Sequence, residues 1–539
     1  MTGVARAYRL VQRDQAFLLP PDMREWLPED HLVWLVLEIV ARLDRSALHA
    51  RHPNVGAGRA AYDPDMLLAL LIYAYCQGVR SSRQIQQRCL TDVAFRVLCA
   101  QDVPDHTTIA RFRAEHQEVF AGLFRQVLQV AAAAGLARFG TVAIDGTKIA
   151  ANASMDANRH RDWLVGEVDA LLGDAAQRDA AEDAAHDQDE DRNHGDGQRM
   201  PAGLRDRSGR AERLRTALAE ITAREQADQQ AEQQREASAA QRLQRAQAGT
   251  PMVGRIPRGP HRLAEARAHL AREIARQQAK HDRRAALIAA GRRPSGRPPV
   301  PVDQHPHVRR AQRALDAALA EQNAPPVTNT PARGSARKPH RRGEAVANTS
   351  DPASRLMPTR RGFLQGYNAQ VAVTADQLIA AVQLGQSPND QAAFVPMMRA
   401  VEQTAAQLHQ RTRHPGHVIG TVLADAGYAS DANLAAPGPD RLIALGKARD
   451  QARTSHTAPA VGPIPADATP REAMRHRLRT QHGAQLYKRR GATVEPGIGN
   501  LKKILDRFSR RGLATAASEL HLAATAFNLR KLHVALASC

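Results

Sequence analysis

The sequence contains little cysteine, few aromatic residues and no long apolar run. Its four cysteines, Cys76, Cys89, Cys99 and Cys539, form no CxxC pair and have no regular spacing, which argues against a zinc site or a disulfide framework. The longest apolar run, 66–75, is far shorter than the roughly 20 residues that a helix needs to cross a bilayer. The first 15 residues lack an apolar signal core. We therefore expect a soluble, cytoplasmic protein with no membrane partner.

Acidic residues are outnumbered by basic ones. The chain has 75 Lys and Arg residues against 55 Asp and Glu residues, which gives a formal net charge of +20. Most of the basic residues are arginine, whose guanidinium group matches phosphate in a bidentate way, so a polyanion is the expected partner. A bias towards Arg and Ala across the whole genome is the alternative explanation of this charge. The length of 539 residues exceeds one ordinary core and indicates two or three domains.

The N-terminal quarter has a helical pattern. From about Asp30 to Leu136 the apolar residues recur at helical spacing, with expected N-caps at Asp63, Ser81 and Asp105. We predict a helical domain over residues 1–137.

The next segment, Thr141 to Thr147, is a short apolar and β-branched run that ends on Asp145 followed by glycine. This pattern is typical of a buried strand followed by a turn. We therefore expect a second domain to begin with this strand.

Residues 155–359 change in character. An acidic, Ala-rich stretch (DAAEDAAHDQDEDRNHGDG) gives way to helix-forming sequence and then to Pro-rich basic stretches such as RRPSGRPPVPVDQHPH and PARGSARKPHRRGE. Few large apolar residues are present to build a core. We expect a helical, partly disordered insertion of long amphipathic helices, as in an antiparallel hairpin. Its low apolar content leaves open whether it forms ordered helices or a simple tether.

Strand signals return after residue 360. GYNAQVAVTA and QLIAAVQL, separated by a turn near Ala375 and Asp376, predict a hairpin. A helix over about 391–410, a strand in HVIGTVLADAG that ends at Asp425 and a short helix capped near Ser430 should follow. The segments from Glu495 through Leu505 and from Ala517 to Leu536 are typical of helices.

Three acids stand at positions suited to a metal site. Asp145 and Asp425 lie at expected strand ends, where a sheet places side chains at an edge crevice. Glu495 precedes Pro496, which favours the first helical position, so Glu495 should stand at a helix start. Lys502, seven residues on, should share its face.

Three convergent carboxylates could hold two Mg²⁺ or Mn²⁺ ions about 4 Å apart, an arrangement suited to phosphodiester transfer. Each acid alone has a plainer explanation. An Asp before Gly at a strand end is commonly a turn former, and a Glu before Pro is commonly an N-terminal helix charge.

Several segments resemble bacterial insertion-sequence transposases of the DDE class. They are TVAIDGTKIAANAS, GYNAQVAV, TVLADAGY, the segment from Tyr487 to Lys502, the N-terminal GRAAYDPDMLLALLIYAYCQGVRSSRQI and PDHTTIARFR, and the closing ELHLAATAFNLRKL. The resemblance spans most of the chain. It implies a ribonuclease-H-like mixed α/β catalytic domain whose signature acids, which bind the metal, are Asp145, Asp425 and Glu495.

The resemblance also implies that Tyr487, Arg490 and Lys502 grip the DNA end near the cut. The gaps between Tyr487, Arg490, Glu495 and Lys502 are two, four and six residues, one residue more between Arg and Glu than in the family signature. Arg and Lys neutralise phosphate, and Tyr can bond or stack, so the chemistry agrees with this assignment. A solvated basic helix is the alternative.

Other candidates have competing explanations. Lys148 could contact a DNA phosphate or lie in solvent after a turn. Arg111 and Arg113 lie on an expected capped helix that could bind DNA like the second helix of a helix-turn-helix, or be an ordinary surface helix. Asp390, in SPNDQAAF, resembles a helix cap more than a further metal ligand.

Together these observations predict three parts: a helical DNA-binding domain over 1–137, a ribonuclease-H-like catalytic domain over 138–154 and 360–539, and the insertion over 155–359. The expected activity is nicking at the ends of an insertion element followed by strand transfer, with double-stranded DNA as partner and a homodimer assembled on nucleoid DNA. The main alternative is a DNA-binding protein of transposase origin that has lost catalysis. A second alternative is a structural protein that binds other proteins through its long charged helices.

Overall fold

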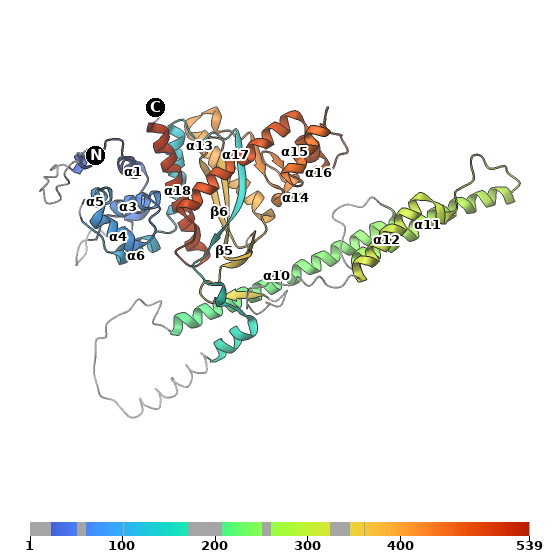
Figure 1. Ribbon diagram of the computed structural model, residues 1–539, viewed down its shortest axis with the longest axis horizontal. Helices are drawn as coiled ribbons and strands as arrows, with labels where there is room; N and C mark the ends of the chain where they lie inside the picture. Colours follow the sequence, from blue (N-terminus) through green and yellow to red (C-terminus); the bar gives the residue numbers. More distant parts are fainter. Residues whose placement is uncertain are drawn as a thin grey trace, which may run out of the picture. The chain divides into compact units, whose positions relative to one another are not determined.

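The computed structural model describes residues 23–50, 61–100, 102–170, 207–250, 260–323, 345–360 and 362–537 (Figure 1). The acidic stretch 179–197 and the basic stretch 331–344 lie outside the described residues. The chain divides into two compact units. The first contains Met1–Leu218 and Val346–Cys539, and the second contains Ala219–Ala345.

The N-terminal part is helical, as the periodicity predicts. In the described residues of this part, a short 3₁₀ turn, η1 (Met23–Trp26), is followed by the α-helices α1 (Leu32–Arg42), α2 (Ser46–His49), α3 (Pro64–Cys76), α4 (Ser82–Thr91), α5 (Val93–Leu98), α6 (His106–Glu115) and α7 (Phe120–Ala133). Asp63 and Asp105 cap α3 and α6 through their carboxylates. Ser81 is the N-cap of α4, but its side chain makes no capping hydrogen bond.

The region after α7 contains a mixed α/β sheet with six strands among the described residues, which confirms the predicted fold class. The path through the sheet is β4-β5-β1-β7-β8, and β6 also pairs with β5. β1 is antiparallel to β5 and parallel to β7, which is parallel to β8. The bounds are β1 (Thr141–Ala150), β4 (Arg355–Thr359), β5 (Gly362–Thr374), β6 (Ile379–Gly385), β7 (Thr421–Ala424) and β8 (Asp440–Ile443).

Helices cover both faces of this sheet. On one face α7 and α13 (Phe394–Thr412) bury apolar side chains against alternate residues of β1 such as Val142 and Ile144. On the other face α17 (Gln481–Ile504) and α18 (Leu513–Ala537) pack against residues of the opposite parity, such as Ala143 and Ile149. Figure 1 shows α17 and α18 lying along the strands. Because side chains alternate along a strand, the parity of a residue in β1 decides which helices it faces.

The N-terminal helices are not packed as a separate body. Leu68 of α3, Phe124 of α7 and Leu520 of α18 belong to one buried apolar cluster with the sheet and α17. The C-terminal helix α18 therefore shares a core with the N-terminal helices.

The expected hairpin is present. β5 and β6 pair antiparallel around the turn after Thr374, and the side chain of Thr374 hydrogen-bonds Asp376. The short helix after β7 is also present as α14 (Asp431–Ala435), capped by Ser430. By contrast, the turn expected after Asp145 is absent, because β1 continues to Ala150 in unbroken register with β5.

The helix that carries Glu495 begins earlier than predicted. α17 starts at Gln481 and contains Pro496 in its interior, so Glu495 lies within the helix rather than at its start. Pro496 has no N–H to bond the carbonyl of Ala492, four residues before it. Gln377, in the turn between β5 and β6, compensates by donating from its Nε2 to the carbonyl oxygens of Ala492 and Thr493, each at 3.0 Å. Two short helices precede α17: α15 (Ala448–Thr457) and α16 (Pro470–Arg479).

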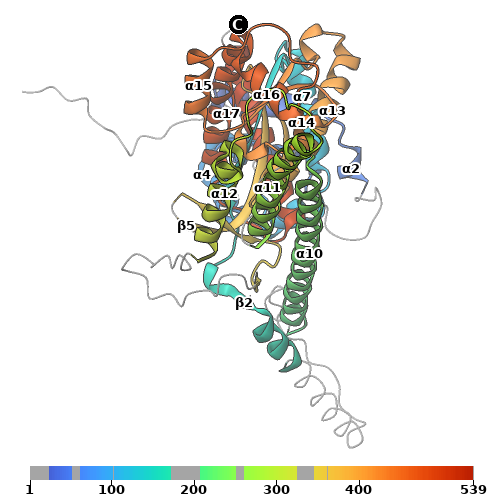
Figure 2. The same cartoon turned by 90° about the vertical axis from the view of Figure 1, so that its right-hand side faces the viewer.

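The remaining elements belong to the insertion and its edges. α10 runs over Arg207–Ala248, and the second unit contains α11 (Pro260–Ala289), the 3₁₀ turn η3 (Val302–Gln304) and α12 (Pro306–Asn323). α11 and α12 lie side by side (Figure 2). They are antiparallel, because Arg262 near the start of α11 pairs with Glu321 near the end of α12. The expected helical hairpin is therefore formed by α11 and α12.

The insertion is shorter than the sequence indicated. β4 pairs with β5 in the main sheet, and β2 (Asn158–His160) pairs with β3 (Val346–Asn348), so both ends of the segment 155–359 belong to the first unit. Over the ranges that the structure describes, no helix combines the length and apolar character that a membrane-spanning segment requires.

Candidate active site

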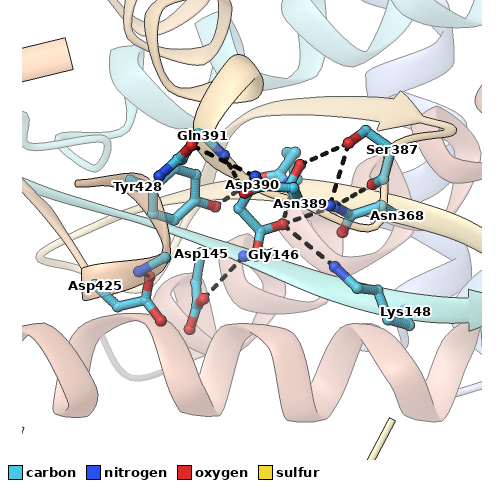
Figure 3. Close-up of polar contacts among 12 residues, drawn as sticks. Asp145, Gly146, Lys148, Asn368, Ser387, Asn389, Asp390, Gln391, Asp425 and Tyr428 are labelled. Atoms are coloured by element: carbon cyan, nitrogen blue, oxygen red, sulfur yellow. Dashed lines mark hydrogen bonds and ion pairs between the residues drawn. The ribbon is translucent and has the colours of Figure 1, made fainter. Parts of the chain in front are cut away.

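The pairing register brings Asp145 and Asp425 together. β1 and β7 pair in parallel from Thr141↔Thr421 to Ile144↔Ala424; Asp145 is the next residue of β1, and Asp425 directly follows the last residue of β7. β7 ends there, while β1 continues along β5. The two carboxylates therefore lie close together at the carboxyl end of the parallel pair (Figure 3).

Each aspartate is fixed by the backbone of a following glycine. The N–H of Gly146 donates to Oδ1 of Asp145 at 2.9 Å, and the N–H of Gly427 donates to Oδ1 of Asp425 at 2.8 Å. The second oxygen of each carboxylate faces Arg490 of α17. One guanidinium nitrogen lies 2.9 Å from Oδ2 of Asp145 and 3.8 Å from Oδ2 of Asp425. Arg490 therefore links the helix to both acids.

Burial makes Asp145 a weaker acid than an ordinary aspartate. Removal from water raises the pKa of Asp145 to about 6, the positive charge of Arg490 opposes this rise, and the negative charges of Asp425 and Asp390 add to it. A carboxylate in this setting would gain stability from a further cation beside it.

Tyr487 anchors the same face of α17, one turn before Arg490. Its hydroxyl donates to the carbonyl oxygen of Ala424, the residue before Asp425, at 3.3 Å. Burial raises the pKa of Tyr487 to about 12, so its hydroxyl stays protonated near neutral pH. Tyr487 therefore ties α17 to the end of β7.

Glu495 is on the same helix but does not join the two aspartates. It is exposed, and its carboxylate lies near Gly491, where a Cβ would be 3.3 Å from Oε1. Lys502 is likewise exposed on α17. In the part of the chain that the structure describes, no three acidic, histidine or cysteine side chains are grouped closely enough to hold a metal ion. The arrangement thus unites Asp145, Asp425 and Arg490, with Glu495 further along α17.

The chemistry of the aspartate pair suits a divalent cation. Carboxylate oxygens are the preferred ligands of Mg²⁺ and Mn²⁺. Asp145 and Asp425 each direct one oxygen towards the same cationic group, so they can share a cation between them. Two of the three predicted ligands therefore fit a metal in this structure.

A second polar cluster, which the sequence did not reveal, lies beside the aspartates. Asp390 is the N-cap residue of the 3₁₀ turn η4 (Gln391–Ala393), but its side chain makes no capping hydrogen bond, so the predicted capping role is wrong. Its carboxylate instead contacts Lys148, Asn368 and Gln370 (Figure 3). Polar residues two apart on one strand, as Asn368 and Gln370 are, share a face, and that spacing is the signal that could have found the cluster.

Two predicted DNA contacts on α6 differ in exposure. Arg111 is exposed. Arg113 is only 8% exposed, and it donates to the carbonyl oxygen of Arg80 at 2.8 Å and lies 3.5 Å from the hydroxyl of Ser82. Arg113 therefore has a structural role, because its guanidinium bonds the segment at the start of α4 instead of facing solvent.

Comparison with known families places two segments among transposases. A model described as a transposase domain matches residues 21–115, and a model described as a transposase DDE domain matches residues 453–533. The first covers the N-terminal helices up to α6, and the second includes Glu495 but neither Asp145 nor Asp425. No curated protein and no solved structure matches the chain.

These matches show that two segments of the chain are similar to transposase domains. They confirm the resemblance to insertion-sequence DDE transposases that the motifs indicated. Such enzymes bind DNA and generally use divalent metal ions.

Proposed function

We propose that the protein cuts and rejoins phosphodiester bonds at the ends of its own insertion element, with Asp145, Asp425 and Glu495 as its metal-binding acids. The observation that carries this proposal is the convergence of Asp145 and Asp425 beneath Arg490. A two-metal phosphoryl-transfer site needs several carboxylates that face one another. Here two acids lie at the end of a parallel strand pair, and the helix that faces them carries a third acid.

Two Mg²⁺ or Mn²⁺ ions held there would activate a water or a 3′-hydroxyl and stabilise the leaving oxygen. The chain itself supplies the oxygen ligands, and the glycine N–H groups orient them. In the protein alone Arg490 balances the charge of the two aspartates. Glu495 would complete the site by an adjustment of α17 when DNA and metal bind.

Arg490 also has capacity for a phosphate. Its Nε is buried and, among the described residues, has no hydrogen-bond partner. A guanidinium carries several N–H donors, so one that bonds Asp145 through a single nitrogen can bind a phosphate through others when α17 adjusts. Tyr487 beside it and the exposed Lys502 further along α17 would extend this contact along the DNA end.

The wider DNA contact is expected to involve the N-terminal helices. Arg111 is exposed on α6, within the matched transposase domain. Since several basic residues would neutralise phosphates, binding should weaken steeply as salt rises. Both element ends must be handled together, so we propose that a homodimer assembles on double-stranded DNA.

A second candidate is a DNA-binding protein of transposase origin without catalysis. The separation of Glu495 from the aspartate pair favours this alternative, because three ligands are required for the two-metal site. Retention of all three acids favours the enzyme.

The experiment that separates them uses linear duplex DNA carrying the sequence that flanks the gene. We expect the full chain to release a free 3′-hydroxyl at the element end in Mg²⁺ or Mn²⁺ and to join it to a second duplex, with no product in chelator. Binding of the same duplex without any cut in either metal would favour the non-catalytic protein.

A further inference from the structure

Asp390 lies on the opposite side of β1 from Asp145. Asp145 shares its parity with Ala143, which faces α17, whereas Lys148, two residues after Gly146, faces the other way and pairs with Asp390. Asp390 therefore approaches the strand from behind the aspartate pair. This placement argues against a role for Asp390 as a direct metal ligand.

One oxygen of Asp390 is fixed by three donors. The amide nitrogens of Asn368 and Gln370 donate to Oδ1 at 2.7 and 2.8 Å, and Nζ of Lys148 lies 3.3 Å from the same atom. Asn368 and Gln370 are each 2% exposed, so the carboxylate is held by rigid, buried strand residues. Figure 3 shows the contacts that Lys148 and Asn368 make with Asp390. A carboxylate held this firmly has a fixed position relative to β1 and β5.

The two oxygens of Asp390 lie against the two glycines that orient the active-site aspartates. A Cβ on Gly146 would be 2.5 Å from Oδ1 of Asp390, closer than any real contact, and a Cβ on Gly427 would be 3.6 Å from Oδ2. Gly146 and Gly427 are the residues whose N–H groups bond Asp145 and Asp425. Asp390 thus lies between the two backbone segments that set the positions of both acids.

The segment around Asp390 is tied to the turn after Asp425 by further bonds. The side chain of Gln391 donates to the carbonyl oxygen of Ala429 at 3.2 Å, and Tyr428 donates through its hydroxyl to Gln370. Asn433 donates to the carbonyl oxygens of Gln391 and Tyr428, both at 2.8 Å. A displacement of Asp390 would therefore move the turn that holds Asp425.

From this geometry we propose that Asp390 is a positioning residue for the aspartate pair. Its carboxylate, fixed by Asn368, Gln370 and Lys148, sets the separation between Gly146 and Gly427 and thereby the separation between Asp145 and Asp425. Lys148 serves this arrangement as an ion-pair partner and not as a DNA contact. The inference rests on the proposed function in taking Asp145 and Asp425 as the metal-binding acids.

Two variants disturb this arrangement in different ways. Asp390→Asn keeps the size and the Oδ1 acceptor but removes the charge, and Gly146→Ala keeps Asp390 but places a methyl group where its oxygen lies. Matched controls are Asp431→Asn, which removes an exposed carboxylate paired with Arg471, and Gly140→Ala, where a Cβ meets nothing within 4 Å.

The first readout is binding of Mn²⁺ to the full-length protein, measured by calorimetry. Asp390→Asn and Gly146→Ala should each weaken binding by about 10- to 100-fold, the effect typical of residues that orient metal ligands. Both controls should bind as the wild type does. Affinity of Asp390→Asn within twofold of the Asp431→Asn control would overturn the proposal.

A second readout needs no metal. Hydrogen exchange in peptides covering 145–148 and 425–428 should be faster in both variants by about tenfold. This is the change expected when the free energy of local opening falls by the contribution of one hydrogen bond. Unchanged exchange at both segments would also overturn the proposal. Should Asp145→Asn bind Mn²⁺ as the wild type does, the proposed function would fail at its metal site, while the exchange result would still decide the role of Asp390.

Discussion

The guanidinium of Arg490 donates to the carboxylate of Asp145 at 2.9 Å, and the same nitrogen lies 3.8 Å from Asp425. The side chains of Arg490 and Asp145 are only 14% and 22% exposed, so this ion pair is shielded from solvent. A cation from the protein thus occupies the position between the two acids. A divalent ion entering there would have to share the acids with Arg490.

This relationship predicts an unusual effect of removing a positive charge. Arg490→Met should bind Mn²⁺ up to about tenfold more tightly than the wild type in the absence of DNA, because one charge-assisted hydrogen bond no longer competes. The same variant should bind DNA less tightly. Calorimetry and a gel-shift titration measure the two effects. Arg489→Met, at an exposed neighbouring position on α17, serves as the control. Weaker Mn²⁺ binding by Arg490→Met would show that Arg490 organises the acids instead of competing for them.

The strand-end position of the aspartates could be predicted, because an acid after a short apolar run is visible in one segment of sequence. The course of the backbone around them could not. β1 continues past Asp145 because β5 supplies partners as far as Gly366, and that pairing depends on a strand more than 200 residues away.

The same limit applies to the helix facing the site. Pro496 indicated a helix start, but α17 extends through it because Gln377, from a distant turn, bonds the carbonyl that proline leaves without a partner. Asp390 has the local pattern of a cap, and only the packed sheet shows that Asn368 and Gln370 take its carboxylate instead. Long-range side-chain partners, which a local pattern does not contain, account for both differences.

The approach of α17 to the sheet should be sensitive at Gly497. A Cβ there would lie 2.9 Å from Cγ2 of Val373, a stiff β-branched side chain of the buried core. Gly497→Ala should lower the free energy of unfolding by about 1–3 kcal/mol and displace Arg490 and Glu495, reducing cleavage. Thermal unfolding and a cleavage assay measure both.

The control is Gly499 on the same helix, where a Cβ meets nothing within 4 Å. Gly499→Ala should be neutral or stabilising by about 0.5–1 kcal/mol, since alanine has the higher helix propensity. Equal effects of the two substitutions would contradict a tight contact at Gly497.

The two arginines of α6 should respond in opposite ways. Arg111→Gln should weaken DNA binding and reduce the slope of log affinity against log salt by about one, without a change in thermal stability. Arg113→Met should lower stability by about 1–3 kcal/mol, because the carbonyl of Arg80 loses a buried donor, and should bind DNA normally once folded. A DNA-binding defect in folded Arg113→Met, with Arg111→Gln unaffected, would reverse the assignment.

His521 should make the stability of the protein depend on pH. Desolvation between α18 and α7 lowers the pKa of His521 below its ordinary value of 6.5. As pH falls through 6.5 the unfolded chain takes up a proton that the folded chain does not, so the free energy of unfolding should decrease with decreasing pH. When thermal unfolding is followed from about pH 8 to about pH 5.5, the free energy of unfolding should decrease less in His521→Gln than in the wild type.

Exposed His482→Gln controls for the loss of one histidine. An identical pH dependence in wild type and His521→Gln would show that the folded protein accommodates the charged imidazole.

The central claim is that Asp145, Asp425 and Glu495 act together as metal-binding acids. Its most direct test is magnesium-dependent cleavage of a plasmid carrying the flanking DNA of the gene, comparing wild type with Asp145→Asn, Asp425→Asn and Glu495→Gln. We predict that the wild type cuts at the element ends, and that all three variants bind this DNA with wild-type affinity but do not cut it. Cleavage at the wild-type rate by any one variant would contradict the assignment of that acid.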